Sequence, residues 1–166
     1  MAHRGLMFDL VRHFRSVDFI CKQLDIMASL KMNRLHLHLS DDQAWRVQLD
    51  SHPEMIQSSF RKGIEHKGYH ADFVKSPLNY VPGTVSYRED CYGGYLSKEN
   101  IRTILSYAKS RHIEVIPEID MPGHSTALLE IHPELQCSCE QLTGRVACPG
   151  KEATFSFFPL EHSEMR

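Results

Sequence analysis

The segment that most limits which folds this chain can adopt is residues 114–124 (EVIPEIDMPGH), where a short apolar stretch leads directly into ionisable side chains. Val115, Ile116 and Ile119 predict a buried β-strand. The Pro-Gly pair that follows predicts a turn before a helix that begins near Ser125. In α/β enzymes the C-terminal ends of such strands carry reactive side chains, so this is a candidate site, although charged residues also end many ordinary strands.

A second stretch, residues 33–42, alternates leucine and histidine strictly. This period of two predicts a strand with one aliphatic face and one face that carries His36 and His38, and the strand again ends in carboxylates. A third candidate strand, residues 5–11, precedes it and is flanked by arginine and histidine. Arginine, aspartate and histidine at the same end of parallel strands favour a site over coincidence.

The segments between these strands predict helices, each with a serine placed to cap it. Ser16 precedes an amphipathic pattern that ends near residues 31–33, and Ser97 precedes a second pattern. Consecutive β-α-β crossovers without a hairpin signal predict parallel strands. Residues 47–49 could add a short strand, whereas the glycine- and proline-punctuated residues 52–94 predict a long loop of the kind that is usually functional.

Composition limits the size and the partners of the molecule. The chain has 166 residues, 42% hydrophobic content and a formal net charge of -2, which predicts a single globular domain over residues 1–166. The sequence has no basic cluster and no apolar run of transmembrane length, which argues against nucleic acid or membrane as the main partner. No secretion signal is visible at the start, the first strand begins almost at Met1 as in a truncated chain, and the compartment is left open.

The cysteines do not follow a usual zinc pattern. Their number, five, is odd, and Cys137, Cys139 and Cys148 lie close together near the end. A zinc site more usually contains C-x-x-C pairs, so we expect free thiols or one local disulfide. We assign no metal and no other cofactor on these grounds.

Four blocks of sequence together resemble the family 20 glycoside hydrolases, the β-N-acetylhexosaminidases. The blocks occur in order at residues 3–14, 31–46, 93–95 and 115–124, and the resemblance covers roughly residues 3–135. It implies an α/β fold that is a partial TIM (β/α)8 barrel, holding the first three β/α units with a long loop after strand two. In such a barrel the active site lies at the C-terminal ends of the strands.

The resemblance also implies a reaction. Family members remove a terminal N-acetylglucosamine or N-acetylgalactosamine with retention, using the acetamido oxygen of the sugar as the nucleophile. The implied partner is therefore a glycan that contains N-acetylhexosamine. The catalytic acid and the aspartate that orients the acetamido group come from an Asp-Glu pair on strand four of the family. This sequence contains no Asp-Glu dipeptide, so we expect the chain to be inactive alone.

Family residues with supporting roles have matches in this sequence. Asp41 and His124 match a pair that lies behind the acid, where it can tune the pKa of that acid. Asp120 matches another acid at the same strand end, and Arg4 matches an arginine that hydrogen-bonds sugar hydroxyls. We expect Trp45 to pack under the long loop.

Other interpretations remain open. One is a metal-dependent barrel hydrolase that uses His36 and His38 as an H-x-H pair, although these histidines are better explained as barrel packing. Another is a non-catalytic carbohydrate-binding remnant that uses Arg4 and Asp41. The tail from about residue 150 departs from the family pattern, since Pro159 falls where a helix should continue. The unpaired edges of a partial barrel would favour self-association.

Overall fold

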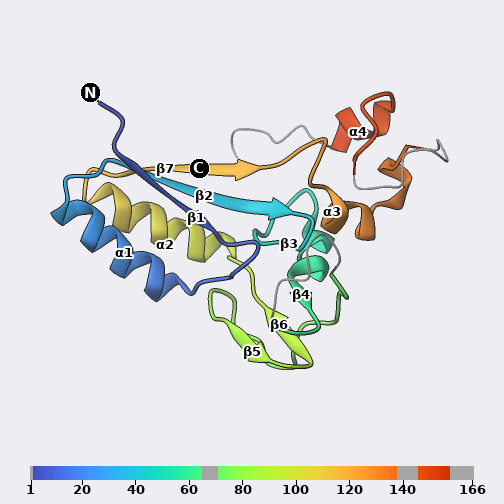
Figure 1. The fold of residues 1–166 in the computed structure, drawn as a ribbon, viewed down its shortest axis with the longest axis horizontal. Coiled ribbons are helices and arrows are strands. Elements are labelled where there is room, and N and C mark those ends of the chain that lie inside the picture. The colour runs from blue at the N-terminus through green and yellow to red at the C-terminus, as the bar shows by residue number, and fades with distance from the viewer. Residues whose placement is uncertain (1, 65–70, 138–145, 158–166) are drawn as a thin grey trace.

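The computed structural model describes residues 2–64, 71–137 and 146–157. At its centre is a parallel sheet in which β2 lies between β1 and β7, and helices α1 and α2 cover one face of that sheet (Figure 1). The predicted order of these elements is confirmed. Their bounds are Gly5–Asp9 for β1, Val17–Ser29 for α1, Arg34–Asp41 for β2, Lys98–Lys109 for α2 and Glu114–Ile119 for β7.

The alternation in β2 divides its side chains between two environments. Leu35, Leu37 and Leu39 are at most 1% exposed and belong to the hydrophobic core beneath the helices. The other face of the sheet presents a row of ionisable groups, because Asp9 of β1 and Glu118 of β7 both lie in register with His38. The apolar leucines therefore hold the sheet on the helices, while the opposite face is left for polar chemistry.

Both predicted helix caps are present. Ser16 Oγ accepts a hydrogen bond from the backbone N–H of Phe19 at 3.3 Å. Ser97 forms a capping box with Asn100: its Oγ accepts from Asn100 N–H at 3.2 Å, and Asn100 Oδ1 accepts from Ser97 N–H at 3.0 Å. These bonds satisfy N–H groups that the first helical turn leaves without partners.

The prediction that residues 52–94 form a long loop is wrong, because the described part of this segment contains regular secondary structure. The segment begins with the 3₁₀ helix η1 and contains a small antiparallel sheet in which β6 pairs with β4 and β5. These strands are too short to show a period-two pattern. The elements are η1 (Pro53–Ser59), β4 (Phe60–Arg61), β5 (Ser86–Arg88) and β6 (Cys91–Gly93).

Gly93 is part of this sheet rather than loop punctuation. Its φ is +146°, and a Cβ at this position would lie 2.2 Å from the carbonyl oxygen of Ser59. A side chain there would collide with the neighbouring backbone. The glycine that suggested a loop is therefore what allows β6 to approach β4.

The short extra strand lies earlier than predicted. It is β3 (Ala44–Trp45), which pairs antiparallel with the end of β2, whereas Val47 forms an isolated bridge with Leu96. The chain reverses at residues 42–43, directly after β2. Trp45 is buried and its Nε1 donates to the Val47 carbonyl at 2.7 Å, so the indole satisfies its polar atom inside the core.

Arg46 connects the segment after β1 to residues next to the small antiparallel sheet. Its side chain is fully buried and donates hydrogen bonds to backbone carbonyls of both regions. Burial lowers the pKa of Arg46 to about 9, which still leaves it charged at neutral pH. The acceptors are Leu10 at 3.0 Å, Val11 at 2.7 Å, Ser59 at 2.6 Å and Gly94 at 2.9 Å.

The chain beyond β7 forms short helices, and the first of them packs against η1 (Figure 1). The helix predicted near Ser125 is α3 (Thr126–Ile131), followed by η2 (Pro133–Leu135) and α4 (Glu152–Phe157). Pro159 lies outside the described residues. Among the helices that the structure describes, none has the length and apolar content to span a membrane.

Candidate active site

Asp41 is the centre of a cluster at the C-terminal ends of the parallel strands. Its side chain is 1% exposed, and Oδ1 lies 2.9 Å from His124 Nδ1 while also accepting from the backbone N–H of Asp42 at 2.6 Å. Oδ2 lies 3.0 Å from His38 Nε2 and 2.5 Å from a guanidinium nitrogen of Arg12. Both oxygens of a buried carboxylate are therefore occupied by donors.

These donors keep Asp41 ionised. Burial alone would raise the pKa of Asp41, but the hydrogen bond from His38, the Asp42 N–H and the charge of Arg12 outweigh it and lower the pKa to about 2. A carboxylate that stays charged can fix the orientation of an imidazole that donates to it. Asp41 therefore holds His124 with Nδ1 inward.

His38 bridges the cluster to β7. Its Nδ1 lies 3.1 Å from Glu118 Oε1, on the opposite side of the ring from Asp41. Burial lowers the pKa of His38, but the hydrogen bond to Asp41 and the charge of Glu118 outweigh it and raise the pKa. His36 Nε2 lies 2.5 Å from the other oxygen of Glu118. The two histidines of the H-x-H pair thus share a carboxylate.

Asp120 lies at the edge of the same cluster. Its backbone N–H donates to Ser40 Oγ at 3.0 Å, and its side chain is hydrogen-bonded to Glu118. Burial, together with the neighbouring charge of Glu118, raises the pKa of Asp120. For Glu118, burial is outweighed by the charge of His38, and the pKa is lowered. Of these two acids, Asp120 is therefore the one that binds a proton more readily.

The loop that carries His124 is anchored by Asp42. Asp42 Oδ1 accepts from the N–H and the hydroxyl of Thr126 at 3.2 and 2.5 Å, at the start of α3. The His124 backbone has a φ of 54°, in the left-handed region, and its side chain is 50% exposed. Two consecutive aspartates thus hold the loop and its histidine, a role of Asp42 that the sequence analysis missed.

The structure brings Asp41, Asp120 and His124 together but places Arg4 elsewhere. Arg4 precedes β1 at the N-terminal end of the sheet, where its Nε donates to the Lys31 carbonyl at 2.6 Å. At a strand rise of about 3.3 Å per residue, the backbone of Arg4 lies about 16 Å from that of Asp9, at the C-terminal end of β1 where the acids gather. Arg12, which the sequence analysis did not single out, occupies the acid end instead.

Arg12 is the cation of the cluster. It pairs with Asp9 at 3.1 Å and with Asp41 at 2.5 Å, and its side chain is 30% exposed. Sets of possible ligand atoms for a metal do occur here, one with Asp120 and one with His124, both including Asp41. A metal cation bound there would face the guanidinium directly, so the charge of Arg12 opposes metal binding at this cluster.

The late cysteines lie apart from these residues in the sequence. Neither Cys137 nor Cys148 forms a disulfide, and the side chain of Cys137 is hydrogen-bonded to Cys148. That hydrogen bond lowers the pKa of Cys148. Cys139 lies outside the described residues.

The amino-acid sequence matches a known family of enzymes over most of its length. Residues 1–162 match the model of the catalytic domain of glycosyl hydrolase family 20. The chain belongs to family 20. Among curated relatives it is 37% identical to a β-hexosaminidase of Porphyromonas gingivalis and 40% identical to N,N'-diacetylchitobiase of Vibrio harveyi, over 94% and 95% of this chain.

Solved structures of family 20 enzymes have the same fold over most of the chain. An exo-β-N-acetylglucosaminidase from Vibrio harveyi, in complex with N-acetylglucosamine, matches with a TM-score of 0.74 and 31% identity over 93% of this chain and 24% of its own. A Streptomyces plicatus N-acetyl-β-hexosaminidase matches with a TM-score of 0.69 and 36% identity over 94% and 28%. The chain spans 18% and 16% of the length of the Porphyromonas and Vibrio relatives.

Proposed function

We propose that this chain supplies the first three β/α units of a (β/α)8 barrel and that the complete barrel is a β-N-acetylhexosaminidase. The parallel order β1, β2, β7, with helices on one face, is what the start of such a barrel requires. The family match supports the reaction class, removal of a terminal N-acetylhexosamine from a glycan. Residues 1–166 would then be the N-terminal portion of a single barrel domain.

The contact between Asp41 and His124 carries the proposal. Asp41 holds His124 Nδ1, which leaves Nε2 of a half-exposed ring for a group at the mouth of the site. A carboxylic acid placed against Nε2 would meet an imidazole that the Asp41 carboxylate holds in a fixed orientation. The pair can therefore adjust the pKa of a general acid that another strand supplies.

Arg12, rather than Arg4, is the residue that we propose contacts the sugar. Its guanidinium lies at the active end of the strands, is partly exposed and already aligns with two carboxylates. A forked cation with several donors suits vicinal sugar hydroxyls. Arg4 is engaged with a backbone carbonyl at the other end of the sheet.

The chain alone should not catalyse the reaction, because its sequence offers no Asp-Glu pair to act as acid and to orient the acetamido group. The test is to fuse residues 1–150 to the remaining barrel of a family relative and to assay release of nitrophenol from a nitrophenyl N-acetylglucosaminide. We expect activity from the fusion and background rates from the 166-residue chain. Turnover by the chain alone, or an inactive but folded fusion, would overturn the proposal.

A further inference from the structure

A second cluster of ionisable side chains lies outside the acid end of the sheet. The triplet His-Pro-Glu occurs twice, at residues 52–54 and 132–134, and each copy opens a 3₁₀ helix with proline in its first turn. In both copies the histidine Nδ1 approaches the glutamate two residues later, at 3.3 and 2.9 Å. The sequence analysis missed this repeat, and the fold brings its two copies together.

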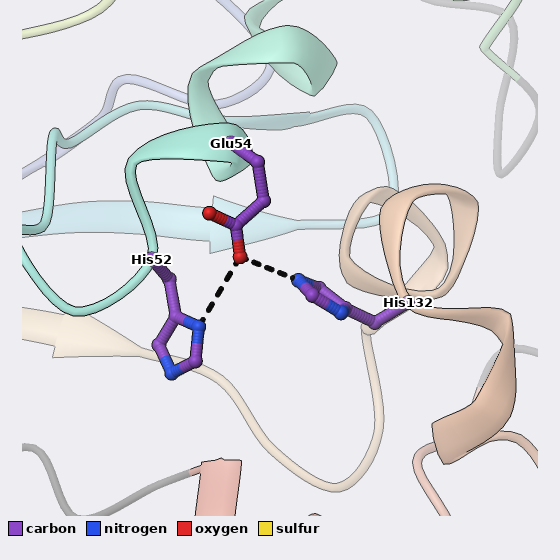
Figure 2. Close-up of side chains that lie close together, drawn as sticks. All are labelled: His52, Glu54 and His132. Atoms are coloured by element: carbon purple, nitrogen blue, oxygen red, sulfur yellow. Dashed lines mark hydrogen bonds and ion pairs between the residues drawn. The ribbon is translucent and has the colours of Figure 1, made fainter.

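The two histidines converge on a single oxygen atom. Oε1 of Glu54 lies 3.3 Å from His52 Nδ1 and 3.0 Å from His132 Nε2 (Figure 2). The three atoms lie within 4.8 Å of one another. Two imidazoles from segments about 80 residues apart in the chain thus point at one carboxylate.

Glu134 fixes the orientation of His132. Its Oε1 accepts from His132 Nδ1 at 2.9 Å, which directs the Nε2 atom toward Glu54. A carboxylate on the outer ring nitrogen is the usual partner of a histidine that binds a metal, because it fixes the tautomer and raises the basicity of the inner nitrogen.

An aromatic side chain closes one side of the cluster. The Phe157 ring of α4 stacks on His52 with centroids 3.9 Å apart and meets the His132 ring at 4.8 Å. The side chains of His52, His132 and Glu54 are 23%, 18% and 34% exposed, so they are supported by the fold and still reachable from solvent. A binding site needs both properties.

We propose that His52, Glu54 and His132 bind a divalent transition-metal ion of the zinc type. Two imidazole nitrogens and one carboxylate oxygen are ligands that zinc prefers, and a water molecule would complete a tetrahedron. Metal–ligand bonds of about 2.1 Å place tetrahedral ligand atoms about 3.4 Å apart. The separations from Glu54 to each histidine already match this spacing, and the two histidine nitrogens need to approach by at most about 1.4 Å.

The charge environment separates this site from the acid cluster. In the part of the chain that the structure describes, the ion pairs of His52, Glu54 and His132 join them to one another and to Glu134, whereas Arg12 pairs directly with Asp41. The cation Lys151 lies beside this cluster, where its Nζ donates to the backbone carbonyl of Glu134 at 2.8 Å. An ion here would link the segment after β3 to the end of α3 and, through Phe157, to α4. It would therefore hold these three segments together.

Isothermal titration of the metal-free 166-residue chain with zinc, and visible absorption of its cobalt complex, test the proposal. We expect saturable binding of about one zinc ion per chain. The cobalt complex should show the visible absorption bands of a four-coordinate, tetrahedral ion. His132→Gln should abolish that binding, and Glu134→Gln should weaken it about 10- to 100-fold because the outer carboxylate is lost. Binding should also raise the unfolding temperature of the parent chain but not of His132→Gln.

Two matched variants exclude other sources of binding. His112→Gln removes an exposed histidine after α2 and should bind zinc like the parent. The variant Cys137→Ser with Cys148→Ser removes the neighbouring thiols and should also keep the site. Equal affinity in His132→Gln and the parent, loss of binding in the cysteine variant, or no stoichiometric binding in a folded parent would each overturn the proposal. In the last case the cluster is an ion-pair network alone.

Discussion

The Nδ1 atom of His124 lies 2.9 Å from Oδ1 of Asp41, across 83 residues of sequence. Because this contact fixes the orientation of the imidazole, Asp41→Asn in a complete barrel should lower kcat roughly 10- to 100-fold, which is part of what general acid catalysis supplies. The pKa of the general acid, read from the alkaline side of the pH profile of kcat, should also fall, while KM changes little. Asp25→Asn, which alters an exposed carboxylate bound to Arg111, is the control for kinetics. Unchanged kcat and pH profile would contradict the role.

The position of Arg12 predicts a different outcome for the two arginines. In the complete barrel, Arg12→Ala should lower kcat/KM about 10- to 150-fold, the worth of one charge-assisted hydrogen bond of about 1.5 to 3 kcal/mol. Arg4→Ala should leave kcat/KM within about twofold, because Arg4 lies at the other end of β1. Steady-state kinetics of both variants decide, and the reverse order would restore Arg4 as the substrate contact.

Stability should decrease on both sides of a window between about pH 4 and pH 6.5. The pKa of Asp41 is lowered from 3.8 to about 2, so its contribution of about 2 kcal/mol is complete above pH 4 and is lost as the pH falls through 2. The pKa of His38 is raised above 6.5 by Asp41, Glu118, Asp9 and Asp120, so its contribution is complete below pH 6.5 and is lost as the pH rises. Urea unfolding across pH measures both limbs.

Single substitutions show which residue causes the loss of stability at each side of this pH window. Asp41→Asn should flatten the acid limb, and His38→Gln should flatten the alkaline limb. A parent whose free energy of unfolding does not change from pH 6 to about pH 8 would show that His38 is not charged in the folded protein.

Removal of Arg46 should be strongly destabilising. Arg46→Met leaves buried carbonyls without donors, and we expect a loss of at least about 3 kcal/mol in the free energy of unfolding. Arg34→Met, which breaks a partly exposed pair with Glu114, should cost less than about 1 kcal/mol. Denaturant midpoints at matched m-values give the comparison, and equal losses would refute a special role for Arg46.

The edge of the sheet predicts association of the 166-residue chain. Among the described residues, β1 pairs with β2 alone, and Met7 on it is 50% exposed. Unpaired strand edges and exposed apolar side chains favour contact between copies. Light scattering should therefore show oligomers, and Met7→Lys should shift them toward monomer. A compact monomer of the parent chain would count against open barrel edges.

The elements with strong local signals were predicted from sequence alone. Alternating leucines in β2 and serines before α1 and α2 identify those elements because side-chain period and capping depend on neighbouring residues. The hairpin of β5 and β6 was missed because its strands are three residues long, and Gly93 was interpreted as a loop residue when it serves a close backbone contact.

The candidate site was partly predictable for a similar reason. Acids at strand ends were visible in the sequence, and parallel topology brings such ends together, as Asp41 and His124 show. Arg4 lies at the opposite end of β1, and its role in sugar binding was implied only by the family resemblance, not by any local pattern. The His52–Glu54–His132 cluster depends on how two distant 3₁₀ helices dock, which no local pattern encodes.

The contacts of Arg46 have a consequence for how freely this sequence can vary. Every carbonyl it binds belongs to the backbone, and a carbonyl is present whichever side chain its residue carries. The arginine therefore depends on the path of the chain at Leu10, Val11 and Ser59, not on their identity. Homologues can exchange those side chains within the limits of packing, whereas a change at Arg46 has no single compensating partner.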